Sequence, residues 1–393
     1  MKRSNVDTAI SEQFETAIKL SDWIFDHPET GRNEYQAQDR ITSMLSANGF
    51  SVEKGVGSIQ TSFRAVWENG QGGPSIGLLC EYDALNGFGH GCGHHMQGPA
   101  VILAAIALKQ SAGAEPFRIV VYGTPDEEDG NGKITMKNNG CFQDIDIALM
   151  THGGPNTTVD VKSLALKTFL VRFHGTPSHA ALNPENGRSA VDAMLLSLHG
   201  LEMLREHVKD DVRMHYEILH TSPTYNVVPD FAEIEYVIRS YSSEYLETVA
   251  QRLERVIQGA AYMTETTVEI EQLDDVLSKI PVPCLNEKIM NYAQQFSAPQ
   301  IIPFREKTGS TDFGNVLHSV PGACVRVAFV PEGTPSHSEG FLAAGKSHQI
   351  HDAIALAARI LANVSADYIE DESFATHVRQ DFEENLRRER NGL

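Results

Sequence analysis

The chain has 393 residues, which is enough for two or three domains and a sizeable core. Hydrophobic residues make up 41% of it and charged residues 21%, values typical of a globular protein. The formal net charge of −20 argues against a nucleic-acid partner, because proteins that bind nucleic acids usually present a basic surface.

The first 150 residues alternate between helical and strand-like patterns of apolar residues. The expected elements are, in chain order, helices at 7–27 and 35–48, strands at 60–67 and 75–81, a helix at 97–110, and strands at 117–123 and 146–152. Several of the strands are almost continuously apolar, as strands buried on both faces are. The alternation predicts an α/β fold with a mostly parallel sheet and helices on both faces.

The pattern changes near residue 163, where LALKTFLVRFHG alternates apolar and polar positions. Such alternation is typical of a sheet with one face exposed to water. The elements expected next are a helix at 188–207, strands at 212–220 and 227–240, a helix at 243–262, and a strand at 264–272. This βαββαβ order predicts a compact α+β domain.

After this domain the alternation of helices and buried strands returns. A helix is expected at 285–296, a buried strand at 325–330 and a helix at 347–363. We therefore expect a domain of residues 164–277 that is inserted into a larger domain of residues 1–163 and 278–393.

The most informative stretch is GHGCGHHMQG, a glycine-rich turn that precedes a buried helix. Cys92 and His94 lie two positions apart in it, and a thiolate beside an imidazole suits a borderline-soft metal ion such as zinc. The glycines allow close approach of the backbone. We interpret Cys92 and His94 as metal ligands. His90 and His95 are further candidates, either in place of His94 or as residues that orient a ligand.

Three other segments carry ligand-type residues directly after apolar strands. Glu127 and Glu128 follow one strand in GTPDEED, and a hydrolytic metal centre needs one carboxylate on the metal and another beside the attacking water. His152 ends a strand in THGG, and His337 follows another in GTPSHSEGF. Because parallel α/β sheets bind ligands at the carboxyl ends of their strands, these residues predict a metal site there.

Four more residues belong to the candidate site without being expected to bind metal. Asp83, just beyond a strand in CEYDAL, is placed to hydrogen-bond a ligand histidine or to cap a helix. His179, Asn226 and Arg239 belong to the inserted segment and would contact a substrate if that domain folds over the site. For Asn226, in a turn, and Arg239, at a strand end, purely structural roles remain open.

The remaining sequence features indicate the cellular compartment of the protein. The five cysteines are odd in number and lack the spacing of a disulfide scaffold. No apolar segment of a secretory signal is visible at the N-terminus, and no run approaches the ~18 apolar residues of a membrane span. We expect a cytoplasmic protein without a membrane partner.

Together these motifs resemble the di-metal aminoacylase and carboxypeptidase family, in the amidohydrolase branch that includes p-aminobenzoyl-glutamate hydrolase and auxin-conjugate hydrolases. The resemblance covers nearly the whole chain and includes CEYDALNGFGHGCGHH, GTPDEE, THGG, HGTPSHAALNPENGRSA, NVVPD, STDFGNV and PSHSEGF. Most members outside the branch have a histidine and an aspartate where this chain has Cys92 and His94. One departure is His95, where branch members commonly have aspartate or asparagine.

The resemblance implies a role for each candidate residue. The implied metal ligands are Cys92, His94, Glu128, His152 and His337. Glu127 would be the general base and Asp83 the supporting acid. His179 would stabilise the oxyanion, often in the active site of a neighbouring subunit, and Asn226 and Arg239 match positions that face the substrate.

The resemblance also implies two divalent metal ions per subunit, with zinc expected and manganese, cobalt and nickel as alternatives. The expected reaction is hydrolysis of an amide bond in an N-acyl amino acid or small peptide, with the larger domain as the catalytic part. The inserted domain would be a lid through which a homodimer or tetramer forms. An aminopeptidase or dipeptidase that acts on unblocked peptides is the main alternative. The additional glutamate at position 127 disfavours a non-catalytic binding protein, and the cysteine and histidine ligands disfavour a phosphate-ester hydrolase.

Overall fold

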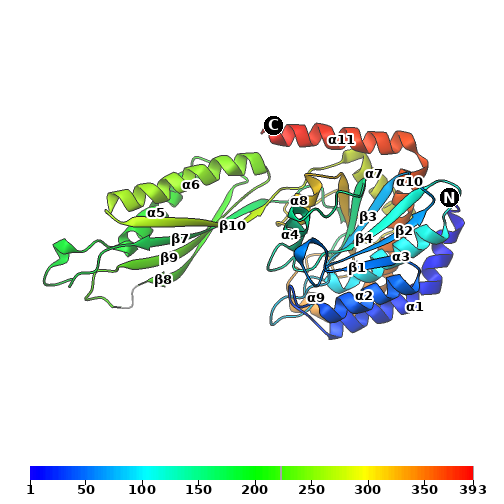
Figure 1. Cartoon of the computed structure of the whole chain (residues 1–393), viewed down its shortest axis with the longest axis horizontal. Helices are drawn as coiled ribbons and strands as arrows, with labels where there is room; N and C mark the ends of the chain where they lie inside the picture. The colour runs from blue at the N-terminus through cyan, green and yellow to red at the C-terminus, as the bar shows by residue number, and fades with distance from the viewer. Residues whose placement is uncertain (222–223, 393) are drawn as a thin grey trace. The chain divides into compact units, whose positions relative to one another are not determined.

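The computed structural model describes residues 1–221 and 224–392, which form two compact units (Figure 1). The larger unit comprises Met1–Lys162 and Lys279–Arg387. The smaller unit comprises Ser163–Ser278 together with the end of the last helix from Arg388. The catalytic and lid roles expected for the two parts of the chain stay predictions.

The larger unit is built on a seven-stranded sheet with the strand order β1-β2-β4-β3-β5-β11-β6. Its strands are β1 (Ser51–Lys54), β2 (Phe63–Asn69), β3 (Ser75–Cys80), β4 (Phe117–Gly123), β5 (Ile147–Gly154), β6 (Thr158–Val159) and β11 (Gly322–Ala328). The four central strands β4, β3, β5 and β11 run parallel, whereas the outer strands pair antiparallel with their neighbours. The predicted α/β fold with a largely parallel sheet is confirmed.

Helices cover both faces of this sheet, because side chains along each central strand alternate between two cores. On β3, Ile76 and Leu78 belong to the core that includes α1, α3 and α10, whereas Leu79 belongs to the core that includes α4 and α8. Helix α3 is buried on every side from Gln97 to Leu108, which explains its uniformly apolar sequence. The larger unit contains the helices α1 (Ser4–Asp26), α2 (Tyr35–Ala47), α3 (Gln97–Gln110), α4 (Gly132–Asn138), α7 (Pro283–Gln295), α8 (Phe313–Leu317), α9 (Glu339–Ala343), α10 (His348–Glu370) and most of α11 (Glu372–Arg390).

The smaller unit has the predicted βαββαβ order. Its elements are β7 (Ala165–His174), α5 (Ala190–Arg205), β8 (Arg213–Thr221), β9 (Phe231–Ser240), α6 (Ser243–Met263) and β10 (Thr267–Val276). The four strands form an antiparallel sheet in the order β10-β7-β9-β8. Along β9, Ala232, Ile234, Tyr236 and Ile238 are buried in a core shared with α5 and α6, and the residues between them are partly exposed.

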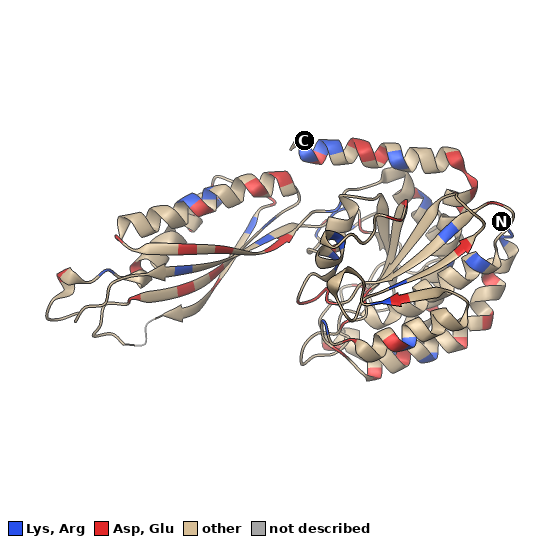
Figure 2. Cartoon of the chain, viewed as in Figure 1, with Lys and Arg blue, Asp and Glu red and all other residues tan. Residues whose placement is uncertain are grey.

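The opposite face of this smaller sheet is charged. Figure 2 shows residues of both signs along its strands. On β7, Arg172 donates to Glu233 on β9 (2.8 Å) and to Glu271 on β10 (2.9 Å), so ion pairs link neighbouring strands. Within the described part of the chain, no helix combines the length and the apolar character that crossing a bilayer requires.

Candidate metal centre

The predicted ligand residues of the larger unit all lie at the carboxyl ends of the four parallel strands. Cys92 and His94 follow β3, Glu128 follows β4, His152 lies near the end of β5, and His337 follows β11. These strands are neighbours in the sheet, so their ends bring the five side chains to one edge.

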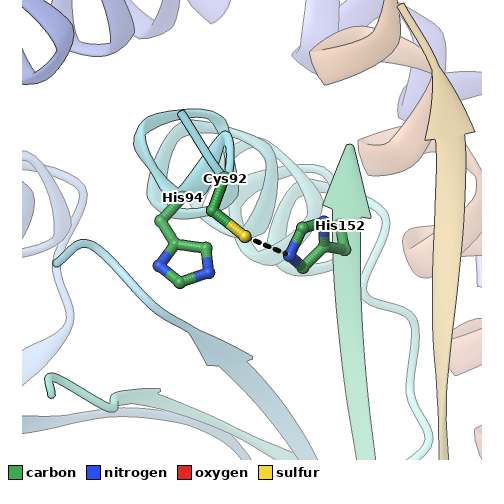
Figure 3. A group of neighbouring side chains, drawn as sticks. All are labelled: Cys92, His94 and His152. Carbon is green, nitrogen blue, oxygen red and sulfur yellow. Dashed lines mark hydrogen bonds between the residues drawn. The ribbon is translucent and has the colours of Figure 1, made fainter. Parts of the chain in front are cut away.

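The turn that carries Cys92 and His94 depends on the glycine between them. Gly93 has a φ of 87°, a left-handed conformation that side chains other than glycine rarely adopt. The rings of Phe329 and Phe341 pack 3.7 Å from the position of a Cβ atom at this glycine. The backbone therefore turns sharply at Gly93, where it packs against these two rings, and the side chains of Cys92 and His94 lie on the same side of the turn (Figure 3).

The first group of ligand-type atoms consists of Cys92, His94 and His152, whose atoms lie within 4.8 Å of one another. Cys92 and His94 come from the turn before α3, and His152 comes from β5 (Figure 3). The Cys92 Sγ points at the His152 ring and lies 3.6 Å from its Nε2. A thiol and two imidazoles at this spacing are a donor set typical of zinc.

The second group consists of Cys92, Glu128 and His337, again within 4.8 Å. The Glu128 Oε1 lies 3.5 Å from the His337 Nε2 and 3.9 Å from the His94 Nε2. The His337 backbone has an uncommon positive φ of 58°, and its N–H donates to the Gly91 carbonyl (2.9 Å), which joins this loop to the Cys92 turn. The two groups share Cys92, so the residues present fit a pair of metal ions.

Two buried atoms of the groups just described support this fit, because neither makes a hydrogen bond of normal geometry to any residue that the structure describes. They are the His94 Nε2 and the Glu128 Oε1. A buried polar atom without a partner is costly, and a metal ion would satisfy both.

Hydrogen bonds hold two of the imidazoles in the orientation that metal binding requires. The His94 Nδ1 donates to the Asp83 Oδ1 (3.0 Å), and the other Asp83 oxygen accepts from the Glu128 backbone N–H (2.9 Å). The His152 Nδ1 lies 2.7 Å from the Gly153 carbonyl oxygen and 2.9 Å from the Arg326 Nη1, which can only donate. With the proton on Nδ1, the Nε2 of the His94 ring is left free to bind a metal ion. Asp83 thus lies where a supporting acid is expected.

The local charges favour the thiolate form of Cys92. Burial alone would raise the pKa of this thiol, but the positive charge that His94 and His152 carry when protonated outweighs burial and lowers the pKa to about 6. The pKa of Glu128 is also lowered. Burial would raise it, but His337 and His94 lower it to about 2. Both side chains are therefore anionic near neutral pH, as metal ligands must be.

Glu127 lies outside both Cys92 groups but forms a third group with His94 and Glu128, whose ligand atoms also lie within 4.8 Å of one another. The Glu127 carboxylate also belongs to a cluster of carboxylates, within 4.8 Å of those of Glu81 and Asp312. Burial and the charges of these two neighbours raise the pKa of Glu127 well above its usual value. The buried Lys133 ammonium is bound to Asp312 (2.7 Å) and Glu81 (2.5 Å), so it supplies the positive charge that this cluster needs.

His90 and His95 lie apart from both groups. The His95 Nε2 lies 2.8 Å from the Gly345 carbonyl, and its ring packs edge-on against Phe25 at 4.9 Å. The His90 ring lies 5.2 Å from the His95 ring, and both side chains are buried. Among the described residues, neither belongs to a group that could hold a metal ion. The structure therefore gives no support for His95 as a replacement for His94.

The remaining three candidates lie in the smaller unit. The exposed His179 and Asn226 are brought together, because the Ala180 N–H, next to His179, donates to the Asn226 carbonyl (2.9 Å). Arg239 lies near the far end of β9, eight positions beyond Phe231, where that strand begins. At about 3.3 Å per residue, the strand separates Arg239 from the His179 end of the unit.

Sequence reasoning missed three charged residues beside the site. The Glu81 carboxylate lies 3.2 Å from the His94 Nε2, and Lys133 forms an ion pair with Glu81. The Arg326 Nη1 on β11 lies 2.9 Å from the His152 Nδ1. Glu81 and Arg326 come from strand segments that are otherwise buried, and Lys133 is itself buried near the start of α4. A charged residue in a buried segment is itself a signal, because it has to be paired.

A parallel sheet with thiol, imidazole and carboxylate groups at its strand ends defines a metal-dependent hydrolase. Residues 75–363 match the model of the Peptidase family M20/M25/M40. The chain belongs to this family of metal-dependent hydrolases that act on amide bonds.

Individual relatives match over almost their whole length. The chain is 30% identical to a p-aminobenzoyl-glutamate hydrolase subunit of Escherichia coli (strain K12), over 96% of this chain and 94% of that protein. It is also 30% identical to the Xaa-Arg dipeptidase of Mus musculus, over 97% of this chain and 92% of that protein. Among solved structures, a dinuclear metal-binding peptidase of the M20 family from Bacillus subtilis shares the fold, with a TM-score of 0.71, 18% identity, and coverage of 92% of this chain and 99% of that chain.

Proposed function

We propose that this chain hydrolyses the amide bond of an N-acyl amino acid or small peptide, with two divalent metal ions bound per subunit. The observation that carries the proposal is the pair of three-residue ligand groups that share Cys92, with the carboxylate of Glu127 beside them and outside both. A binding protein would need the ligands alone, whereas a hydrolase also needs a base.

The metal ions would be held by Cys92, His94 and His152 on one side and by Cys92, Glu128 and His337 on the other. Zinc is the proposed metal, because cysteine and histidine are its preferred ligands; manganese, cobalt and nickel are the alternatives. When bound, such a pair supplies Lewis acidity that lowers the pKa of water and polarises a carbonyl. A reducing compartment such as the cytoplasm would keep Cys92 available as a thiolate.

Glu127 is the proposed general base. Its carboxylate would take a proton from the attacking water and return it to the leaving amine. A raised pKa suits this role, because it makes the carboxylate a stronger base than that of an ordinary glutamate. Asp83 would keep His94 oriented through its 3.0 Å hydrogen bond.

Three residues of the smaller unit are proposed to contact the substrate. The Nδ1 of His179 accepts from the N–H groups of Ala181 and Leu182 (3.2 Å each), so the proton of the neutral ring is on Nε2. That N–H is suited to donate to a developing oxyanion. Asn226 and Arg239 would bind the backbone or the carboxylate of the substrate; because β9 separates Arg239 from His179 and Asn226, these residues would reach one substrate from different subunits.

The proposal is tested by measuring amine release by the metal-loaded protein from N-acyl amino acids and from unblocked dipeptides. We expect hydrolysis of the blocked substrates. The similarity to the Xaa-Arg dipeptidase favours a second candidate function, that of a dipeptidase. Faster hydrolysis of the unblocked dipeptides than of the blocked substrates would establish the dipeptidase. If the fully metal-loaded protein releases no amine from either panel, both candidates are wrong.

We also propose that the smaller unit forms a homodimer, or a tetramer built from such dimers. Strand β8 is an edge of the smaller sheet, and its exposed side chains include Tyr216, Ile218 and Leu219. On α5, Met203 is 72% exposed. Apolar side chains on an unpaired strand edge are a liability in a monomer and are typical of a subunit interface.

A lysine at Ile218 is expected to convert this oligomer to monomers, because a charge on the edge strand would have to be buried unpaired. Leu273 on β10 is the matched control, since it lies at the opposite edge of the same sheet and both side chains are 47% exposed. Light scattering should give a monomer mass for Ile218→Lys and the wild-type mass for Leu273→Lys. An unchanged mass in Ile218→Lys would rule out this interface.

A further inference from the structure

A cluster of positive charge surrounds a single carboxylate in the larger unit. Asp160 follows β6 and is buried. Its Oδ1 accepts from the Arg305 Nε (2.8 Å), and its Oδ2 accepts from the Arg326 Nε (2.7 Å). The Lys279 Nζ lies 3.6 Å from the same Oδ2. Burial would raise the pKa of Asp160, but these three cations lower it far below its usual value.

The two guanidinium groups exceed what Asp160 needs for charge balance. One cation neutralises one buried carboxylate, and a second nearby cation adds repulsion. The repulsion is visible at Arg305, whose pKa is lowered by burial and by the charge of Arg326. A structural ion pair alone would not require this arrangement, whereas a site for a second anion would.

Both guanidinium groups also keep N–H groups available. Arg305 contacts Asp160 through Nε and Nη2, and Arg326 uses Nε for Asp160 and Nη1 for the Gly153 carbonyl (2.9 Å). Within residues 1–221 and 224–392, the Arg305 Nη1 and the Arg326 Nη2 have no hydrogen-bond partner. The two side chains are 28% and 16% exposed, so part of each is open to solvent.

This cluster adjoins the candidate metal centre through His152. Arg326 on β11 pairs in register with His152 on β5, and its Nη1 lies 2.9 Å from the His152 Nδ1. The other nitrogen of that ring faces the Cys92 Sγ. One imidazole ring therefore separates the guanidinium of Arg326 from the Cys92 thiol.

We propose that Arg305 and Arg326 form a carboxylate-binding subsite beside the metal centre, which selects substrates that carry a second carboxylate. This inference rests on the proposed amide hydrolysis and names the substrate class of the same site. Arginine is suited to the task because its planar N–H groups bind carboxylates in pairs. The acid group would be either on the amino-acid side of the scissile amide or on its acyl side.

The test uses two pairs of substrates that differ in one acid group. N-acetyl-L-glutamate is compared with N-acetyl-L-glutamine, and N-succinyl-L-leucine with N-butanoyl-L-leucine. We expect the wild-type enzyme to prefer the acidic member of at least one pair. In Arg305→Gln, kcat/KM for that acidic substrate should fall about tenfold or more, mainly through KM, with less than about a threefold change for its neutral partner.

Two variants separate substrate binding from a structural role. Arg359→Gln is the matched control, because Arg359 is also partly exposed and ion-paired, to Asp7, and it should leave the preference unchanged. Arg305→Lys retains the charge and should recover part of the lost preference.

The outcomes distinguish this inference from the proposed function. Loss of preference in the glutamate pair would place the acid on the amino-acid side, and loss in the succinyl pair would place it on the acyl side. A wild-type enzyme without acidic preference, or an equal loss for acidic and neutral substrates in Arg305→Gln, overturns the subsite while amide hydrolysis stands. No hydrolysis of any of the four substrates, or of the wider panels above, contradicts the proposed function itself.

Discussion

Replacing Glu127 with glutamine is expected to reduce kcat by about 10²–10⁴-fold while the protein keeps its metal ions. The amide has nearly the same shape as the carboxylate but cannot accept a proton from water. Because Glu127 lies outside both ligand groups that contain Cys92, the substitution should leave the metal ions bound. The rate of amine release and the metal content of the purified variant are the two quantities to measure.

Two neighbouring acids serve as controls for this variant. Asp129→Asn changes an exposed acid two positions away and should leave kcat near the wild-type value. Glu128→Gln changes a proposed ligand and should lower the metal content together with the activity. If Glu127→Gln keeps most of its activity, the assignment of the base is wrong.

Replacing Cys92 with alanine is expected to remove both metal ions, whereas replacing His337 with alanine should weaken mainly one. The reason is that Cys92 belongs to both three-residue groups and His337 to only one of them. Elemental analysis after dialysis should give about two ions per subunit for the wild-type protein, close to none for Cys92→Ala and about one for His337→Ala.

The control for this prediction is Cys141→Ala, which removes a buried thiol from the core of the same unit, away from the ligand groups. It should keep the full metal content, although its stability is expected to fall through the small cavity it creates. Two firmly bound ions in Cys92→Ala would show that the shared-ligand arrangement is wrong.

The candidate site could be predicted from sequence because its parts follow recognisable strands. Apolar runs at 75–81, 117–123, 146–152 and 325–330 mark four strands, and ligand-type residues lie at the end of each or soon after. The carboxyl ends of parallel strands meet at one edge of a sheet, so the clustering of these residues follows from the fold. The structure brings those of the larger unit together; their chemical roles stay predictions.

The charged residues around the site were not predicted, because their partners are distant in sequence. Arg326 lies within the apolar run VRVAFV, and its partner Asp160 is 166 positions away. Lys133 binds Asp312 across 179 positions. Such pairs depend on which elements the fold makes adjacent, and local patterns of hydrophobicity do not contain that information.

Some elements of the fold were also missed. Strand β6 has two residues, too few to give a period. Helix α11 is rich in charge and buries only a narrow stripe, Phe374, Ala375, Val378 and Phe382. Most of its surface faces water, so its average hydrophobicity is low although its spacing is helical.

The central claim, metal-dependent amide hydrolysis, is tested most directly by titrating chelator-treated protein with zinc while amine release and bound metal are measured together. The account predicts no hydrolysis without metal, and activity that rises to a plateau at about two ions bound per subunit. The Glu127→Gln variant should bind the same two ions without activity. Full activity in the metal-free protein, or two ions bound without amine release from any blocked or unblocked substrate, would contradict it.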